Sequence, residues 1–200
     1  ALYLVRGGTA GKAITAAGED GSAADRLEAL AEDAGLLAGS MPRTVKDALS
    51  DLYAQGATFL PAVEADEALT AAGYGILKGD SLAGWAEGDA ALGVNLVLGQ
   101  VDADMVELPL DGGGVAALRV VGARTSVRPV MDGGALTGLS LTCTLDANMA
   151  EGNLDLRTEE VHASLEAALA QVEEARIRSA LELAQELDCL LYTSPSPRDS

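Results

Sequence analysis

The pattern of hydrophobic and polar positions predicts four helices along the chain. In each of them apolar residues recur at intervals of three or four positions and so share one face. The predicted helices span residues 22–37, 44–53, 86–98 and 158–188. Gly88 and Gly93 weaken the third helix by about 1 kcal/mol each relative to alanine. Another element must therefore pack on this helix to hold it.

The second helix carries its own start signal. Thr44 occupies the N-cap position and Asp47 follows three residues later, which is a variant of the capping box because aspartate replaces the usual glutamate or glutamine. Within this helix Val45, Leu49 and Leu52 form the stripe that we expect to be buried.

The same pattern predicts a β-hairpin at residues 73–85. Apolar residues lead into the polar group 78–81 and out again towards Trp85, the only tryptophan. Gly79 can adopt the positive φ that a tight turn requires. An extended segment at residues 55–61 and an acidic hinge at residues 64–67 precede the hairpin.

Three further β segments follow, at residues 105–110, 115–131 and 136–149. The last alternates strictly, which places one face in a core and the other in water. Its inward face would hold Leu139, Leu141, Cys143, Leu145 and Ala147. Asp-Gly-Gly turns join these segments, so we predict a three-stranded antiparallel meander.

The last helix sets the fold class. At 1.5 Å per residue it is about 45 Å long, with one apolar face and one glutamate-rich face. It needs a surface of matching length, and the alternating sheet supplies one. We therefore predict an α+β fold, in which an antiparallel sheet of long strands packs against a long C-terminal helix, preceded by the helical end of an N-terminal mixed α/β domain.

Three segments are predicted from these elements. Residues 1–68 are interpreted as the C-terminal part of a truncated N-terminal domain, because a strand at Leu2–Val5 is already under way where the sequence begins. Residues 69–188 form the second domain. Residues 189–200 break the helical pattern abruptly and resemble a translated sequencing adapter, so we expect this tail not to be native. A genuine Ser/Pro-rich tail is the alternative.

Composition narrows the function classes. The formal net charge is −18, with 31 acidic and 13 basic residues. Such a charge repels phosphate backbones and anionic head groups, so neither nucleic acid nor a basic membrane anchor is expected. No apolar run approaches the roughly 20 residues that span a bilayer. Without the tail, Cys143 is the only cysteine, which excludes an intrachain disulfide or a cysteine metal cluster.

Few residues suggest chemistry. His162, the only histidine, lies among glutamates and could be a base or metal ligand, but a surface position is favoured because no other ligand or nucleophile accompanies it. Cys143 is expected to be a small buried hydrophobe. The pairs Asp102/Asp104 and Asp66/Glu67 could serve glycoside chemistry, yet chance pairs are expected among 31 acids. We predict no catalytic residue, no metal site and no cofactor.

Three arginines fall in one predicted strand of this acidic chain, namely Arg119, Arg124 and Arg128. They could dock an acidic partner surface, since interface rims often carry arginine. The alternative is an outer sheet face whose arginines pair with nearby carboxylates, each exposed pair contributing well under 1 kcal/mol.

From Ala72 onwards the order of features resembles the C-terminal part of the Ger(x)C family of spore germination proteins. The similarity is carried by Ala72–Trp85, by Leu98-Gly99 at the end of an acidic helix, and by the strand Arg124-Thr125-Ser126-Val127-Arg128-Pro129-Val130. The turn Asp132-Gly133, the alternating strand and the long last helix follow in order. The family is usually lysine-rich, whereas this chain is acidic and alanine-rich.

The resemblance implies a non-enzymatic lipoprotein subunit of a spore nutrient germinant receptor. Such subunits are lipid-anchored at the outer face of the spore inner membrane and lie beside two integral-membrane subunits, A and B. The signal and lipid-attached cysteine of the family are absent from this sequence. The resemblance further implies that a sheet face or the acidic helix face contacts those partners. A secreted carboxylate-based hydrolase or solute-binding protein is the alternative, and it predicts a deep pocket with two carboxylates.

Overall fold

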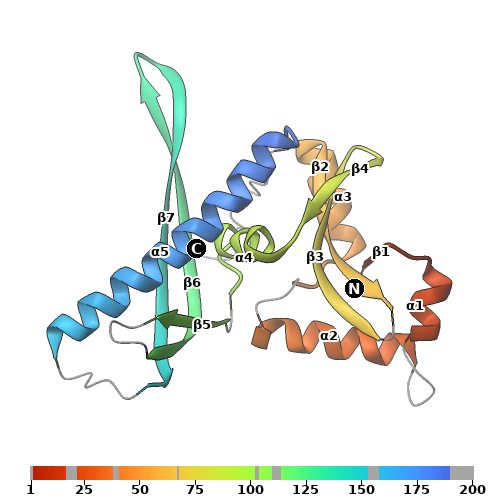
Figure 1. Ribbon diagram of the computed structural model, residues 1–200. Helices are drawn as coiled ribbons and strands as arrows, with labels where there is room; N and C mark the ends of the chain where they lie inside the picture. Colours follow the sequence, from red (N-terminus) through yellow and green to blue (C-terminus); the bar gives the residue numbers. More distant parts are fainter. Residues whose placement is uncertain are drawn as a thin grey trace.

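The fold consists of two β-sheets joined by two helices (Figure 1). The computed structural model describes residues 2–16, 22–37, 41–66, 68–101, 104–109, 114–152 and 158–189, apart from the side chains of residues 31–37 and 136. One sheet has the strand order β1-β2-β3-β4 and the other β5-β6-β7. The long helix α5 (Glu159–Glu186) runs from the three-stranded sheet to the four-stranded one. The predicted α+β class is confirmed.

The predicted hairpin forms one side of the four-stranded sheet, and its second strand is an edge strand. It consists of β3 (Leu69–Lys78) and β4 (Ser81–Ala86), and Gly79 in its turn has a φ of 61°. The extended segment expected at 55–61 belongs to β2 (Ala57–Ala65), which pairs antiparallel with β3 and parallel with β1 (Leu4–Arg6).

The acidic segment at 64–67 is not a hinge where the structure describes it. Glu64 and Ala65 are the last residues of β2 and pair with Thr70 and Leu69 of β3. Glu67 lies outside the described residues. Because the β2–β3 pairing resumes at Val63 after a register shift and continues to Ala65, backbone hydrogen bonds hold these last residues of β2 in place. The division of the chain at residue 68 stays a prediction.

The N-terminal helices are α1 (Ala10–Ala16), α2 (Ala23–Leu37) and α3 (Val45–Gln55). The capping box predicted for α3 is present. The Asp47 N–H donates to Thr44 Oγ1 at 3.2 Å, and the Thr44 N–H donates to Asp47 Oδ2 at 2.9 Å. The Thr44 hydroxyl also donates to Asp47 Oδ2 at 2.7 Å, and this bond, together with the one from the Thr44 N–H, lowers the pKa of the Asp47 carboxyl.

The buried stripe predicted for α3 is wrong at two of its three positions, Val45 and Leu49, whereas Leu52 is half-buried. Val45 is 57% and Leu49 60% exposed, whereas Ala48 is buried. The reason is that Asp51 fixes which face of α3 meets the sheet. It pairs with Arg43 and accepts a hydrogen bond from Thr58 Oγ1 of β2 at 3.1 Å. The small side chain of Ala48, one turn earlier on that face, allows close approach.

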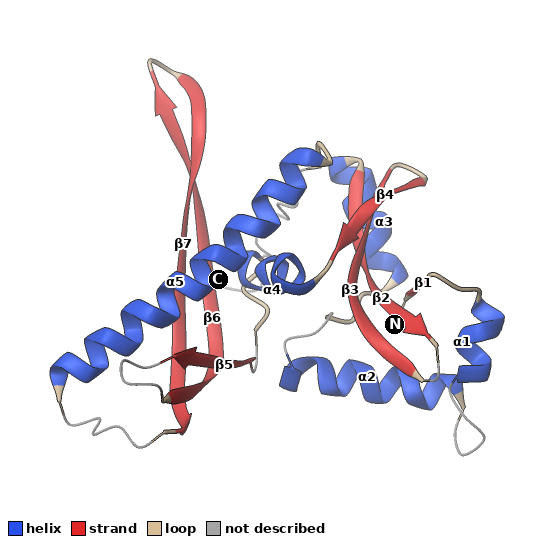
Figure 2. Cartoon of the chain, in the orientation of Figure 1, coloured by secondary structure: helices blue, strands red, loops and turns tan. Residues whose placement is uncertain are grey.

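The second sheet is the predicted meander. It contains β5 (Asp104–Pro109), β6 (Val115–Asp132) and β7 (Ala135–Glu151), with both pairs antiparallel. Strand β5 pairs only with residues 115–120 of β6, so the outer part of β6 and β7 projects as a two-stranded ribbon (Figure 2). Because β5 does not extend along this ribbon, the expected core face of β7 is only partly buried, and Leu139 is 58% exposed.

Helices α4 (Gly88–Val97) and α5 link two hydrophobic cores. Val94 and Ala180 belong to the core of the four-stranded sheet, whereas Leu96 and Leu165 belong to that of the three-stranded sheet. Tyr74 ties β3 to α4, because its buried hydroxyl donates to Asn95 Oδ1 and accepts from the Met41 N–H. None of the described helices combines the length and the apolarity that a membrane span requires.

The partner that Gly88 and Gly93 were expected to need is α5. A Cβ atom added at Gly93 would lie 2.0 Å from the carbonyl oxygen of Arg176 and 2.9 Å from Cβ of Ala180. The two helix backbones therefore touch at this crossing, and only glycine fits there.

Gly93→Ala is expected to destabilise the fold although alanine is the better helix former. Overpacking against backbone costs about 1–3 kcal/mol, which exceeds the gain of about 1 kcal/mol in helix propensity. The measurement is the free energy of unfolding in urea. Gly11→Ala in α1, where the nearest atom is 3.6 Å away, serves as the control and should be neutral or stabilising. An equal effect of the two substitutions would contradict the crossing.

Candidate functional site

The three predicted docking arginines lie on one face of β6. Arg119 pairs with Asn148, and Arg124 with Thr144. Between them Val120 pairs with Ala147 and Gly122 with Asp146, which leaves Val121 as an extra residue. This β-bulge shifts the alternation by one position. Arg119 therefore shares the outward face with Arg124 and Arg128, and all three are exposed.

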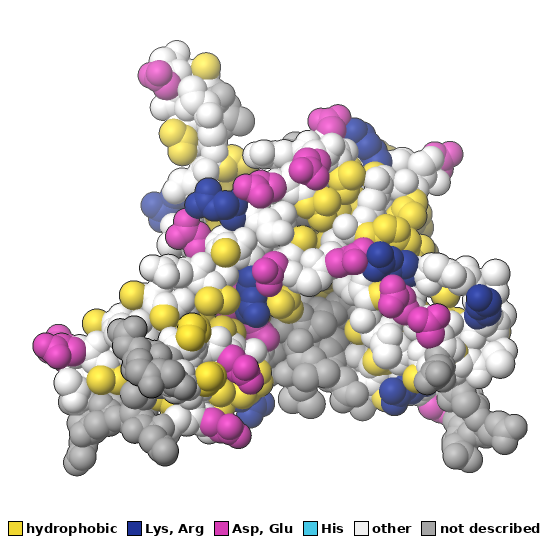
Figure 3. Space-filling model, viewed as in Figure 1, with side chains coloured by type: hydrophobic (Ala, Val, Ile, Leu, Met, Phe, Trp, Pro, Cys, Tyr) yellow, Lys and Arg dark blue, Asp and Glu magenta, His cyan; other side chains and the backbone are white. Residues whose placement is uncertain are grey.

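Only one of these arginines has a partner among the described residues. Arg124 lies 3.1 Å from Asp146, with both side chains largely exposed, so this pair contributes little to stability. Arg119 and Arg128 make no ion pair within the described ranges. Figure 3 shows few and separate basic side chains on the visible surface, among more numerous acidic ones. The arginine face, defined as Arg119, Arg124 and Arg128, is thus a local positive feature.

A buried group of charges lies where α4, α5 and β5 meet. Arg176 Nη1 is 2.6 Å from Asp104 Oδ2 and 3.0 Å from Glu173 Oε1, and Arg176 Nε is 3.6 Å from Asp89 Oδ1. The side chains of Arg176, Asp104 and Glu173 are at most 12% exposed. Two buried carboxylates therefore share one guanidinium.

This sharing affects the protonation of both carboxyl groups. Burial raises the pKa of the Asp104 and Glu173 carboxyls above their usual values. The reason is that the desolvation energy of each carboxylate exceeds the attraction that it gains from Arg176. Glu173 Oε2 is buried without a hydrogen-bond partner. The group is a structural joint between the two halves of the fold that retains one unsatisfied acceptor.

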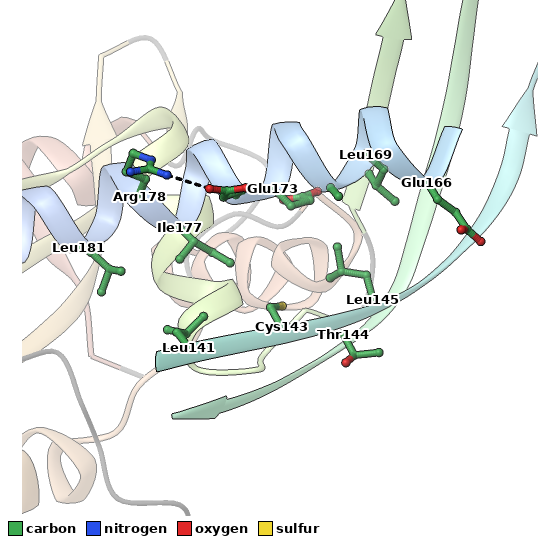
Figure 4. A pocket seen from close by; sticks show the side chains of 12 residues that line it. Leu141, Cys143, Thr144, Leu145, Glu166, Leu169, Glu173, Ile177, Arg178 and Leu181 are labelled. Atoms are coloured by element: carbon green, nitrogen blue, oxygen red, sulfur yellow. Dashed lines mark hydrogen bonds and ion pairs between the residues drawn. The ribbon is translucent and has the colours of Figure 1, made fainter. Parts of the chain in front are cut away.

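A groove of about 710 Å³ lies between α5 and β7. Figure 4 shows Leu141, Cys143 and Leu145 of β7 pointing towards the helix, and Ile177 and Leu181 of α5 pointing towards the strand. Three glutamates and one arginine complete its lining, namely Glu166, Glu173, Glu174 and Arg178. Arg178 is paired with Glu174 at 2.7 Å. The groove is therefore apolar along its length and acidic on its helix side.

The remaining candidates are scattered. His162 is exposed in the first turn of α5, and Asp66 is exposed after β2. Asp102 and Glu67 lie outside the described residues. Cys143 is half-buried in the groove, and burial raises the pKa of its thiol, which disfavours the reactive thiolate. Within the described residues no three His, Cys, Asp or Glu side chains are grouped as metal ligands would be.

Sequence reasoning missed the buried charges and the groove. The sequence pattern singles out Asp104 only as half of an acidic pair, and it does not single out Glu173 or Arg176. One signal was available. Positions 165, 169, 173, 176 and 180 follow the helical spacing of the inward stripe, so Glu173 and Arg176 interrupt an apolar face with a complementary pair three residues apart.

Residues 72–190 match the family model described as "Spore germination B3/GerAC like, C-terminal". The match covers more than half of the chain. The chain belongs to this family. The resemblance to the Ger(x)C proteins is thereby confirmed, and the hairpin, the meander and α5 together make up the GerAC-like region.

The GerAC-like chain also matches a solved structure. The crystal structure of the GerBC protein aligns with a TM-score of 0.58 and 16% sequence identity, over 72% of this chain and 46% of the GerBC chain. At this identity the match establishes the similarity of fold. The chain thus corresponds to less than half of the length of GerBC. A search of the curated proteins gives no match.

Once the Arg176 guanidinium is removed, the buried carboxyl groups of Asp104 and Glu173 should make the stability of the GerAC-like region depend on pH. Arg176→Met leaves Asp104 and Glu173 uncompensated and is expected to cost about 3–5 kcal/mol at neutral pH. Folding raises the pKa of both carboxyls, so the cost is greatest at a pH above their pKa in the folded state. It disappears at a pH below their pKa in the unfolded state, which is about 4.

Urea unfolding of both proteins at neutral pH and near pH 4 measures this effect. The difference between variant and parent should shrink as the pH falls. Arg178→Met, which removes an exposed arginine from the same helix, is the control and should cost about 0.5 kcal/mol or less at either pH. A cost of Arg176→Met that is independent of pH would contradict the assignment of the charges.

Proposed function

We propose that the chain is part of a C subunit of a spore nutrient germinant receptor, a non-enzymatic lipoprotein that works in germination through contacts with other proteins. The family match over residues 72–190 is the observation that carries this proposal. The similarity of fold to GerBC supports it. The charged groups add support, because Asp104 and Glu173 are engaged by Arg176 and are not presented together to a substrate.

The partners and the location follow from the same proposal. The integral-membrane A and B subunits of the receptor are the proteins contacted, at the outer face of the spore inner membrane. A lipid anchor would be carried by a part of the protein that this sequence does not contain. The carboxylate-based hydrolase is the weaker alternative, since the groove glutamates all belong to one helix and no opposing acid faces them in the described residues.

The arginine face is the surface that we assign to an acidic partner. It lies on the outer side of β6, away from α5, and two of its three side chains lack a counter-charge among the described residues. In a chain with a net charge of −18, such a patch attracts an acidic surface while the rest of the molecule repels it. This arrangement favours one docking orientation.

Reversing charge on this face is expected to weaken receptor assembly. Arg124→Glu combined with Arg128→Glu in the full-length protein should reduce its co-isolation with the neighbouring membrane subunits about tenfold at physiological salt, and should slow germination. The matched control is Arg26→Glu with Lys46→Glu, which changes the net charge equally on exposed residues of α2 and α3.

Both outcomes of this comparison are informative. If co-isolation with the membrane subunits falls for the double substitution at Arg124 and Arg128, and not for the one at Arg26 and Lys46, the docking role of the arginine face is supported. Equal recovery of all proteins would refute that role. Absence of any association between the parent protein and the membrane subunits in germination-competent spores would refute the receptor proposal itself.

A further inference from the structure

Strand β7 presents a long edge that nothing covers in the described residues. It pairs with β6 alone, and between Gly138 and Asp146 this pairing runs without a bulge. Residues 138–145 contain neither a charge nor a proline. Proteins normally protect edge strands with charged side chains, prolines or bulges, because an unprotected edge accepts another strand. The edge of β7 lacks all three protections over eight residues.

The groove beside this edge has a defined chemistry. Its strand side is apolar, whereas its helix side carries Glu166, Glu173 and Glu174 against a single Arg178. Arg178 is already paired with Glu174. Glu173 is 4% exposed, and its second carboxylate oxygen has no hydrogen-bond partner. A buried acceptor of this kind is costly unless a donor reaches it. Because Glu173 Oε1 is paired with Arg176 and Glu174 with Arg178, the groups of the groove that lack a partner among the described residues are Glu166 and Glu173 Oε2.

We propose that this groove binds an extended basic segment of a partner protein. The segment pairs with the free edge of β7 through its backbone. Since side chains alternate along a strand, every second residue faces α5. A lysine or arginine among them reaches Glu166 and Glu173, and apolar residues contact Leu141 and Leu181. The inference rests on the proposed role as a contact subunit, because a partner supplies the segment.

Charge selects this occupant over a second copy of the chain. Two copies joined edge to edge through β7 would bring two glutamate-lined grooves together, in molecules that each carry a net charge of −18. Like charges placed close together at an interface cost several kcal/mol. A basic segment instead neutralises the groove and satisfies the unpaired oxygen of Glu173.

The test uses the purified 200-residue chain and a fluorescently labelled peptide of nine residues. Valine occupies every second position of the peptide, and lysine and threonine take turns at the positions between. Fluorescence anisotropy should show saturable binding in the micromolar range. The same peptide with glutamate in place of lysine should not bind. Absence of lysine-peptide binding, or equal binding of both peptides, would overturn the proposal.

Two pairs of variants locate the site. Glu166→Gln with Glu173→Gln should weaken binding about tenfold, whereas Glu182→Gln with Glu186→Gln, which removes the same charge from exposed positions of α5 outside the groove, should not. Leu141→Lys, on the groove face, should abolish binding. Ser140→Lys, exposed one position earlier on the opposite face, should retain it. Circular dichroism confirms that each variant is folded.

Alkylation of Cys143 gives an independent readout. Because this thiol lines the groove, bound lysine peptide should slow its reaction with iodoacetamide, mapped by mass spectrometry. An unchanged rate at saturating peptide would place binding elsewhere and overturn the proposal, as would dimerisation through β7 in sedimentation experiments without peptide. Peptide binding to the groove combined with failure of the full-length protein to associate with membrane subunits would count against the proposed function alone.

Discussion

The contact between α4 and α5 determines the geometry of the whole chain. At Gly93 the backbone of α4 lies directly against the carbonyl group of Arg176, and the fully buried Ala180 occupies the next turn of α5. Such an approach is possible only where side chains are absent or minimal. It fixes the distance between α5 and α4 and the direction of α5, and therefore the positions of the α5 side chains over both sheets.

The buried charges are a consequence of the same crossing. Arg176 lies at the point of closest approach, and its side chain reaches Asp104 of β5 and Asp89 of α4, so that three elements meet in one set of ion pairs. Burying these charges costs desolvation energy, and replacing them with apolar residues is often neutral or stabilising in proteins. Their contribution is better understood as orientation, because few other placements of α5 would bring Arg176 to Asp104 of β5 and Asp89 of α4 together. The groove opens because α5 then runs in a different direction from the twisted ribbon of β6 and β7 (Figure 1).

Much of the fold could be predicted from local signals, and the limits of prediction are physical. The Thr44 cap, the hairpin and the turn at Asp132-Gly133-Gly134 depend on short-range backbone chemistry, and each occurs where the pattern placed it. The other Asp-Gly-Gly turn, at 111–113, lies outside the described residues. The exposed Val45 and Leu49 were not predictable, because periodicity identifies an apolar face without saying which face a neighbour covers. The bulge at Val121 leaves no mark in the sequence, and counting by twos would have put Arg119 and Arg124 on opposite faces. Glu173 and Arg176 became meaningful only when β5 and α4 were placed beside them.

Helix α5 contributes residues to two hydrophobic cores, and this has a consequence for folding during translation. Leu165 and Leu169 complete one core, Ala180 and Ala184 the other, and all four come from the last described helix. Contacts between residues so distant in sequence are slow to form. During synthesis the ribosome must therefore pass residue 169 before the core of the three-stranded sheet can close, and residue 184 before the core between the four-stranded sheet and α4 can close. Until then the small core formed by α1, α2 and the four-stranded sheet, which includes Ala13, Val63 and Leu69, is the one that can be complete, so the open strands of the meander depend on protection from aggregation during translation.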